Sequence, residues 1–297
     1  MKARIKEIAL DKYILEILDT QEEITASIRG NTKKKNSILV GDLVEVEKSY
    51  DRYMIEKVLD RKNSLIRPPV ANIDNLVIVV SLANPRPDFF LLDKQIVLCI
   101  SKNITPIIVI NKIDLNLTEK TKSDISYIRE VYMKLGIKVI EVSSKEGIGI
   151  DTLKASLKNK ISAFSGNSGV GKSSIINAIF EDKINKAIVS DVARKTNRGK
   201  HTTKHVRIYT DKDMYILDTP GFSSYELYDI EYKKLKEFYP EFEKHKCEYL
   251  DCNHVNESVE VCKVKEAVDK NLINKDRYGR YIELFSKLKE QDDKKYK

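Results

Sequence analysis

One segment, GNSGVGKSS beginning at Gly166, restricts the fold of this chain more than any other. It matches the pattern of a glycine, four residues, and then Gly171, Lys172 and Ser173. The glycines let the backbone wrap around phosphates, while backbone N–H groups and the start of a helix supply positive potential. The apolar strand ISAFS precedes the motif and the helix-like SSIINAIF follows it, which argues against a simple glycine-rich turn. The sequence therefore predicts a phosphate-binding loop in an α/β domain.

The residues of this loop have distinct expected roles. Lys172 should reach the β- and γ-phosphates and take part in catalysis, and Ser173 should ligate Mg²⁺. Downstream, DTPG ends the apolar strand MYIL, which places Asp218 to hold Mg²⁺ through water and the Gly221 N–H to sense the γ-phosphate. The nucleotide-binding residues predicted in the loop are Gly166, Asn167, Ser168, Gly169, Val170, Gly171, Lys172, Ser173 and Ser174.

A second motif, NKID, follows the apolar strand IIVI and has the form of a guanine-reading loop. Asp114 can accept two N–H bonds from the guanine edge that adenine cannot offer. Asn111 supplies an amide nearby, and Lys112 lays its apolar stem along the base. After the next strand, the loop SSKEG, which starts with Ser143 and Ser144, resembles the element that contacts the guanine oxygen through backbone N–H groups.

The stretch 183–204, between the phosphate loop and DTPG, is basic and lacks sustained periodicity. Thr202 or Thr203 should complete Mg²⁺ coordination when the γ-phosphate is present, with Thr203 preferred. Phe222 follows DTPG where many GTPases place a water-orienting glutamine, so intrinsic hydrolysis should be slow. His201 is the candidate for positioning the attacking water, and a surface or RNA-contacting histidine is the alternative.

The order of these motifs is unusual, because the guanine-reading elements precede the phosphate loop. The chain carries first the two base-contact loops, then the phosphate loop, then the Thr202/Thr203 segment (the first switch) and finally DTPG (the second switch). This is a cyclic shift of the usual GTPase order, and each element is intact. The sequence therefore predicts a circularly permuted GTPase. In that arrangement DTPG leads out of the domain, so movement of this switch can be transmitted to the C-terminal segment.

A metal site is predicted near the C-terminus, where Cys247, Cys252, His254 and Cys262 form a Cys-x4-Cys-x-His-x7-Cys arrangement. Three thiolates and one imidazole make a closed tetrahedral zinc site of the structural kind. His245 could replace His254, and reduced structural cysteines are the alternative to a metal. The Arg and Tyr residues of the last helix could contact RNA or pack on the neighbouring domain, and a mixture of both roles is expected: Arg277, Tyr278, Arg280 and Tyr281.

The flanking segments complete a multidomain prediction. Short alternating strands in residues 1–67 predict an OB-like β-barrel that binds RNA. Residues 68–222 are predicted to form the circularly permuted P-loop GTPase α/β domain, and residues 223–297 a helical zinc-binding domain. The formal charge of +8 favours a polyanionic partner such as nucleic acid. No apolar run is long enough for a signal peptide or a membrane span, so a soluble, cytoplasmic protein is expected, without membrane contacts.

These residues resemble one family, the bacterial small-ribosomal-subunit-dependent GTPases called RsgA. The resemblance covers essentially the whole chain, including the permuted motifs, GKHTT, DTPGF and the Cys/His cluster. It implies a late maturation factor that binds rRNA of the small (30S) ribosomal subunit near the decoding region. It also implies GTP hydrolysis that the subunit stimulates and that promotes release of the factor. Lys200 stands where the family often has arginine, and Ser144 where alanine is frequent.

Two other functions are compatible with the motifs. The chain could be a housekeeping GTPase whose partner is not the ribosome. Alternatively, it could be an RNA-binding assembly checkpoint for which GTP is only a conformational ligand, an interpretation that Phe222 leaves open. No coiled-coil pattern indicates obligate association, so a monomer is expected.

Overall fold

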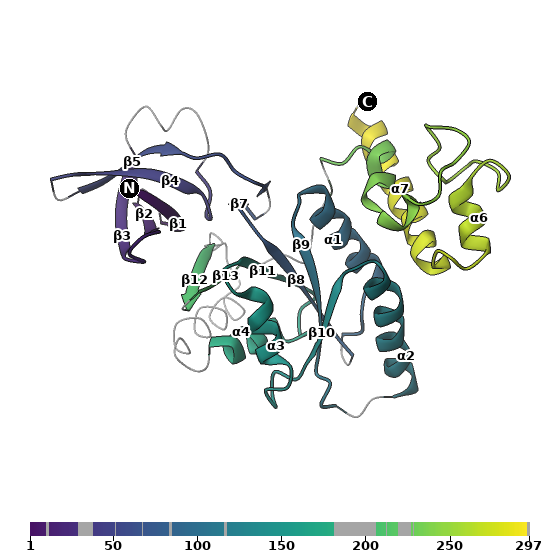
Figure 1. Ribbon diagram of the computed structural model, residues 1–297, viewed down its shortest axis with the longest axis horizontal. Helices are drawn as coiled ribbons and strands as arrows, with labels where there is room; N and C mark the ends of the chain where they lie inside the picture. The colour runs from purple at the N-terminus through teal and green to yellow at the C-terminus, as the bar shows by residue number, and fades with distance from the viewer. Residues whose placement is uncertain are drawn as a thin grey trace.

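The structure, a computed structural model, has three parts arranged in a row, with the α/β domain in the middle (Figure 1). It describes residues 1–9, 12–28, 38–50, 52–66, 68–82, 85–115, 118–180, 206–211, 213–218, 227 and 229–295. Within these residues, no helix is both long enough and apolar enough to cross a membrane.

The N-terminal part is a closed barrel of five strands, as the sequence predicted. Its strands are β1 (Lys2–Ala9), β2 (Lys12–Ile17), β3 (Glu23–Ile28), β4 (Leu43–Ser49) and β5 (Arg52–Val58). They pair in the order β1-β2-β3-β5-β4, and β4 returns to β1 to close the barrel. Alternate residues point inward, so Ile5, Leu15 and Ile55 are fully buried in its core. This is the topology of an OB-like barrel.

A short hairpin links the barrel to the central domain. It consists of β6 (Ser64–Leu65) and β7 (Val70–Ala71), with Pro68 and Pro69 in the turn between them. Proline removes a backbone donor and fixes φ, which suits a turn and ends the preceding strand. The hairpin therefore separates the strands of the barrel from those of the central sheet.

The central domain contains a parallel sheet with one antiparallel edge strand. Its strands are β8 (Asn75–Ser81), β9 (Thr105–Asn111), β10 (Lys138–Val142), β11 (Ile161–Ser165), β12 (Arg207–Asp211) and β13 (Met214–Asp218). They lie in the order β10-β9-β8-β11-β13-β12, and only β12 is antiparallel to its neighbour. The near-continuous burial of β8 and β9 is typical of strands covered on both faces.

Helices cover both faces of this sheet. On one face lie α1 (Phe89–Ser101) and α2 (Glu119–Ile128), which continues as a π-helical turn through Met133; on the other lie α3 (Ile150–Leu157) and α4 (Lys172–Phe180). The N-terminus of α1 is fixed by Asp88, whose carboxylate accepts a bond from the Leu91 N–H at 2.9 Å. The two apolar layers confirm the predicted α/β domain and give it a doubly wound architecture.

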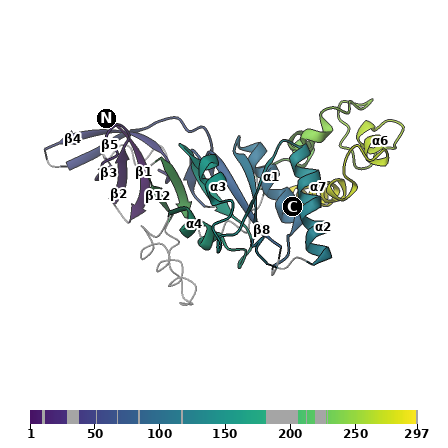
Figure 2. The same cartoon turned by 60° about the horizontal axis from the view of Figure 1, so that its bottom comes forward.

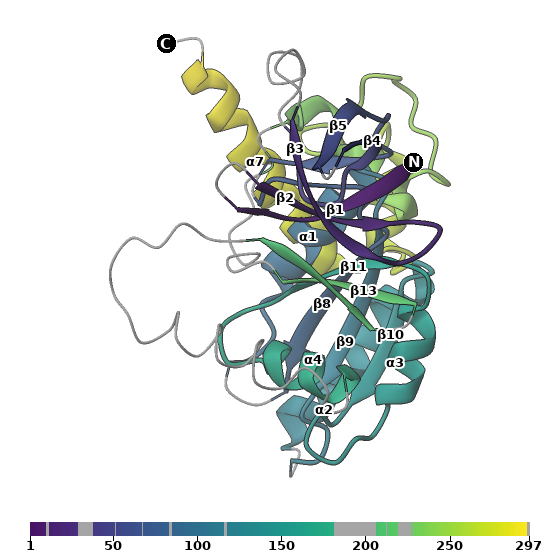
Figure 3. The same ribbon diagram turned by 90° about the vertical axis from the view of Figure 1, so that its left-hand side faces the viewer.

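The barrel is joined to the sheet at the edge formed by β12. Glu7 of β1 lies opposite Arg207 of β12, so the described strands of both domains form one eleven-stranded sheet. Seen from the barrel side, the barrel lies directly against this end of the sheet (Figure 3). The Arg207 guanidinium also forms an ion pair with Glu7 at 3.2 Å. In the sequence, β12 and β13 lie between the two predicted switch segments, which are outside the described residues.

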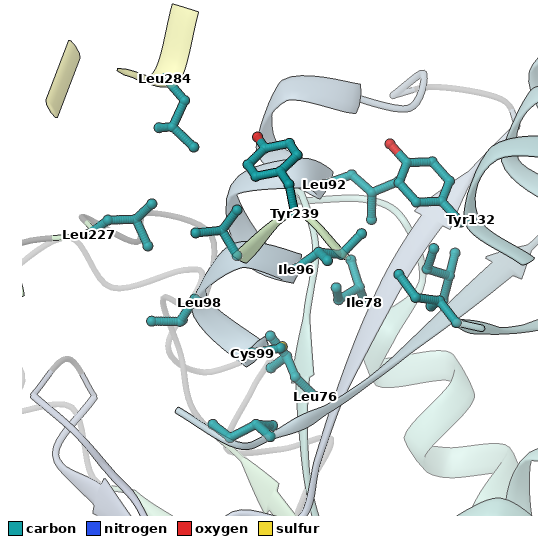
Figure 4. Packing of buried hydrophobic residues seen from close by; sticks show 14 of the residues in the cluster. Leu76, Ile78, Leu92, Ile96, Leu98, Cys99, Tyr132, Leu227, Tyr239 and Leu284 are labelled. Atoms are coloured by element: carbon teal, nitrogen blue, oxygen red, sulfur yellow. The ribbon is translucent and has the colours of Figure 1, made fainter. Parts of the chain in front are cut away.

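The C-terminal module (residues 229–295) packs on α1 at the opposite end of the molecule (Figure 2). It comprises two 3₁₀ turns, Tyr232–Phe238 and Pro240–Phe242, followed by α6 (Lys263–Asp269) and α7 (Lys275–Lys295). Leu284 of α7 and Tyr239 belong to the same apolar cluster as Leu92 and Ile96 of α1 (Figure 4). The module thus shares a continuous core with the central domain.

Candidate nucleotide-binding site and metal centre

The phosphate loop connects β11, in the middle of the sheet, to α4. Parallel strands flank β11 on both sides, so the loop emerges at the carboxyl edge where ligands bind in such folds. Gly166, Gly169 and Gly171 have φ angles of 137°, 83° and 97°, a region that side chains disfavour. A Cβ atom on Gly166 would lie 2.2 Å from the Val79 carbonyl oxygen. The glycines are therefore required both by the loop conformation and by its close packing on the sheet.

Lys172 lies across the loop that it follows. Its ammonium donates to the carbonyl oxygens of Gly166 at 2.7 Å and Asn167 at 3.0 Å. Partial burial lowers the pKa of Lys172 from its ordinary value. With the adjoining N-terminus of α4, which carries Ser173 and Ser174, this ammonium concentrates positive potential where an anion would bind.

The predicted guanine-reading loop is hydrogen bonded directly to the phosphate loop. Asn111, fully buried at the end of β9, donates from Nδ2 to the Val170 carbonyl at 2.9 Å. Its Oδ1 accepts the Ser144 N–H at 3.2 Å, and Lys112 donates to the Gly169 carbonyl at 2.8 Å. The sequence predicted Asn111 as a group near the base; its amide holds three loops in register.

Asp114 is positioned by the second base-contact loop. The Ser143 hydroxyl donates to the Asp114 carboxylate at 2.6 Å and accepts the Glu146 N–H at 3.1 Å. The bond from Ser143 lowers the pKa of Asp114, which keeps this exposed carboxylate ionised. An ionised carboxylate is the kind of acceptor needed to bind the two N–H donors of a guanine edge.

Several predicted residues are outside the described part of the chain. His201, Thr202, Thr203, Gly221 and Phe222 lie there, so their roles stay predictions. The backbone of Asp218 ends β13, one strand away from the phosphate loop, because β13 pairs in parallel with β11.

Sequence reasoning missed a buried polar pair behind the loop. Gln95 of α1 donates to the Ser165 hydroxyl at 2.6 Å, immediately before Gly166. Both side chains are buried, and they fix the distance between α1 and the start of the loop. The sequence could have indicated this pair, because Gln95 is a polar residue within the apolar stretch that forms α1. A buried amide requires a hydrogen-bond partner.

The four predicted metal ligands meet in the C-terminal module. His254 Nδ1 lies 3.4 Å from the sulfur of Cys247, 3.3 Å from that of Cys252 and 3.5 Å from that of Cys262. The sulfurs of Cys247 and Cys262 are 3.9 Å apart. In a tetrahedral zinc site, the ligand atoms lie about 3.5 Å apart for a nitrogen and a sulfur and about 3.8 Å apart for two sulfurs. The donor set therefore has the size and chemistry of a structural zinc site.

The surroundings of this site agree with that chemistry. Burial raises the pKa of the Cys252 and Cys262 thiols, so a cation is needed to stabilise their thiolates. Tyr278 donates to the His254 carbonyl at 2.6 Å, which fixes the histidine at its positive φ of 60°. His245 is outside this cluster and lines an exposed hollow. Among the described residues, the structure thus selects His254.

The basic and aromatic residues of α7 serve mainly to attach the module. Arg277, 1% exposed, is bonded to Asp93 of α1 and to Glu241, and Arg280 donates to the same Asp93 carboxylate. Tyr281 is fully buried. The structure therefore supports the packing part of the predicted mixture, and RNA contact by this helix stays a prediction. The sequence could have indicated this attachment, because Asp93 is a charged residue within the otherwise apolar start of α1.

Comparison with known proteins decides the family. The family model described as RsgA GTPase matches residues 58–228. The chain belongs to the RsgA GTPase family. Two curated relatives, both described as small ribosomal subunit biogenesis GTPase RsgA, come from Caldanaerobacter subterraneus subsp. tengcongensis and Thermotoga neapolitana. The first is 40% identical over 92% of each chain, and the second is 39% identical over 91% of this chain and 90% of its own.

Two solved structures share the architecture. YjeQ from Thermotoga maritima superposes with a TM-score of 0.84 and 35% identity, covering 97% of this chain and 98% of its own. YloQ, described as a circularly permuted GTPase, has a TM-score of 0.80 and 30% identity, covering 98% and 95%. The prediction of a circularly permuted GTPase is thus confirmed, and the protein is a GTP-hydrolysing enzyme of the RsgA family.

Proposed function

We propose that this enzyme acts late in maturation of the small ribosomal subunit, binds the subunit's rRNA in the cytoplasm as a monomer, and is stimulated by the subunit to hydrolyse GTP. The observation that carries the proposal is the direct bonding of the guanine and phosphate loops within a permuted domain flanked by a barrel and a Cys/His module. The curated relatives of this architecture are described as small ribosomal subunit biogenesis GTPases.

In the proposed mechanism, catalysis depends on positioning and charge stabilisation. Asp114 selects guanine, while Lys172 and the loop N–H groups neutralise the β- and γ-phosphates. Ser173 and Asp218 are the residues that would hold Mg²⁺, which would neutralise charge developing on the phosphates. Thr203, or Thr202, would complete that coordination, and His201 would orient the attacking water because Phe222 has no donor or acceptor.

Charge and fold support rRNA as the binding partner. The net charge of +8 favours a polyanion, and OB-like barrels commonly bind oligonucleotides. The C-terminal module adds an exposed hollow that is lined by four lysines: Lys244, Lys246, Lys263 and Lys270. Glu266 forms ion pairs with two of these lysines, which leaves the hollow with a net positive charge.

The metal is proposed to be one structural zinc ion held by the Cys/His cluster. Metal analysis of the purified protein should find about one equivalent of zinc, and a Cys262→Ser variant should lose it. His245→Ala is the matched control, because it changes a nearby histidine outside the cluster and should keep the zinc. Less than about half an equivalent in the parent protein would contradict the proposal.

Switch movement is proposed to reach both neighbouring parts of the molecule. β12 and β13 connect the switch segments, β12 is bonded to the barrel, and the chain after Asp218 continues toward the C-terminal module. Hydrogen exchange in β1 and in the C-terminal module should therefore differ between the GDP form and a non-hydrolysable GTP analogue form. Equal exchange in both forms would contradict this coupling.

One experiment tests the central proposal. GTP turnover is measured for the protein alone, with purified small subunits, with large subunits and with bulk RNA. Strong stimulation by small subunits alone is the expected result, and a His201→Ala variant should lose it. Stimulation by another partner would favour a different housekeeping role. Nucleotide-dependent RNA binding without stimulated turnover would favour the assembly-checkpoint function.

A further inference from the structure

The tip of the β4–β5 hairpin carries an aromatic side chain in an unusual setting. Tyr50 is 97% exposed, and its φ of 52° lies in the left-handed region that glycine and asparagine favour. A tyrosine gains nothing in folding from full exposure, and its Cβ disfavours this backbone conformation. Tyr50 therefore adds nothing to the barrel core and is unfavourable for the turn conformation. This points to a contact with a binding partner.

Tyr50 lies in the turn of the β4–β5 hairpin, directly after Ser49, which pairs with Arg52. The hairpin projects from the end of the molecule opposite the C-terminal module (Figures 1 and 2). Alternate residues of a strand face the same side, so Lys48 and Tyr53 lie on the inward-facing side of β4 and β5. These two residues are opposite each other near the tip. The Lys48 ammonium is 5.4 Å from the centre of the Tyr53 ring. At the tip, the core-facing side of the strands thus becomes an aromatic and cationic surface.

Neighbouring strands extend the same surface. Tyr13 of β2 lies opposite Ala26 of β3, which in turn lies opposite Tyr53 of β5. Tyr13 and Tyr53 are both only partly buried against the barrel core. Arg52, the first residue of β5 after the turn, is exposed and pairs with Ser49, so it lies on the opposite face of the hairpin from Lys48 and Tyr53. The hairpin tip and this mouth of the barrel therefore combine aromatic rings with cationic side chains.

We propose that Tyr50 is a stacking platform for an unpaired RNA base, with Lys48 and Arg52 contacting the adjoining phosphates. A base is a flat partner that a single exposed ring can recognise, whereas one ring is too small an area for a stable protein interface. The basic residues beside it match a phosphodiester chain. The proposal rests on the proposed rRNA-binding function and assigns one contact of that interface.

Binding measurements on matched variants test the assignment. Tyr50→Asn removes the ring but suits the positive φ, so the barrel should keep its thermal stability. Its affinity for a single-stranded RNA oligonucleotide and for purified small subunits should fall about 5- to 150-fold, the usual effect of losing one stacked base. Tyr249→Asn is the control, because Tyr249 is also more than half exposed but lies in the C-terminal module.

A spectroscopic test distinguishes stacking from a general loss of affinity. The chain contains no tryptophan, so Tyr50→Trp provides a single reporter at the tip. Its fluorescence should be quenched by single-stranded RNA and much less by duplex RNA, and Tyr249→Trp should report no such difference. Affinity of Tyr50→Asn within twofold of the parent, or equal quenching by both RNAs, would overturn the stacking contact. Small-subunit-stimulated turnover of the parent would still support the proposed function in that case.

Discussion

The contact between the two nucleotide loops makes Gly171 a sensitive position. Its φ is 97°, and a Cβ added there would lie 2.2 Å from Nδ2 of Asn111. Asn111 is fully buried, so its side chain has little room to move without losing its partners. A Gly171→Ala substitution should therefore separate the guanine loop from the phosphate loop, although neither base-contacting nor phosphate-contacting side chain is changed.

The size of this effect follows from the contacts involved. An alanine at positive φ costs about 1–2 kcal/mol. Displacing Asn111 breaks its bonds with the Val170 carbonyl and the Ser144 N–H, each worth about 0.5–1.5 kcal/mol. Without GTP, the two loops of the variant can relax and avoid these costs. Binding GTP forces both loops back into their native arrangement, so the summed cost of about 2–5 kcal/mol reduces the free energy of GTP binding. The Kd for GTP should rise about 30- to 5,000-fold.

Titration of a fluorescent GTP analogue into zinc-replete protein measures this Kd. Gly136→Ala is the matched control, because Gly136 has a φ of 77° but no atom lies within 4 Å of the position that a Cβ would take there. The control should lose some stability and keep its GTP affinity. A Gly171→Ala protein that binds GTP within threefold of the parent would refute the reasoning, as would an equal loss in the control.

Three further substitutions test other parts of the structure. Asp114→Asn should weaken GTP binding at least about a hundredfold, because two charge-assisted bonds are lost, and should shift preference to xanthine nucleotides in a competition assay. Arg277→Met should lower the free energy of unfolding by about 3–5 kcal/mol in urea titrations, since it removes the buried cation beside Glu241 and leaves Asp93 paired with Arg280 alone; a change below about 1 kcal/mol would contradict this. Burial raises the pKa of Glu16 above its ordinary 4.5, so the folded protein binds its proton more tightly than the unfolded chain, and stability falls as pH rises from 4.5 through the raised value. Glu16→Gln should therefore raise the melting temperature at pH 7 and leave it unchanged at pH 4, and equal shifts at both pH values would count against this explanation.

Much of the site could be predicted from contiguous residues. The phosphate loop depends on glycines at fixed spacing between a strand and a helix, and the structure places Gly166 and Lys172 in that arrangement. The four candidate zinc ligands were equally recognisable by residue type and spacing, and the structure brings the predicted His254 to the three cysteines. The OB-like barrel followed from short alternating strands, because one buried face imposes a period of two.

By itself, the sequence determined the motifs, their permuted order and the periodicity of each element, because these depend on residues that are neighbours along the chain. Only the tertiary structure decided that Asn111 links two loops, that Arg277 is buried against Asp93, and that β1 joins β12. Such contacts connect residues that are far apart in sequence. No local pattern specifies which polar side chains will meet, since burial and partner are set together when the domains pack.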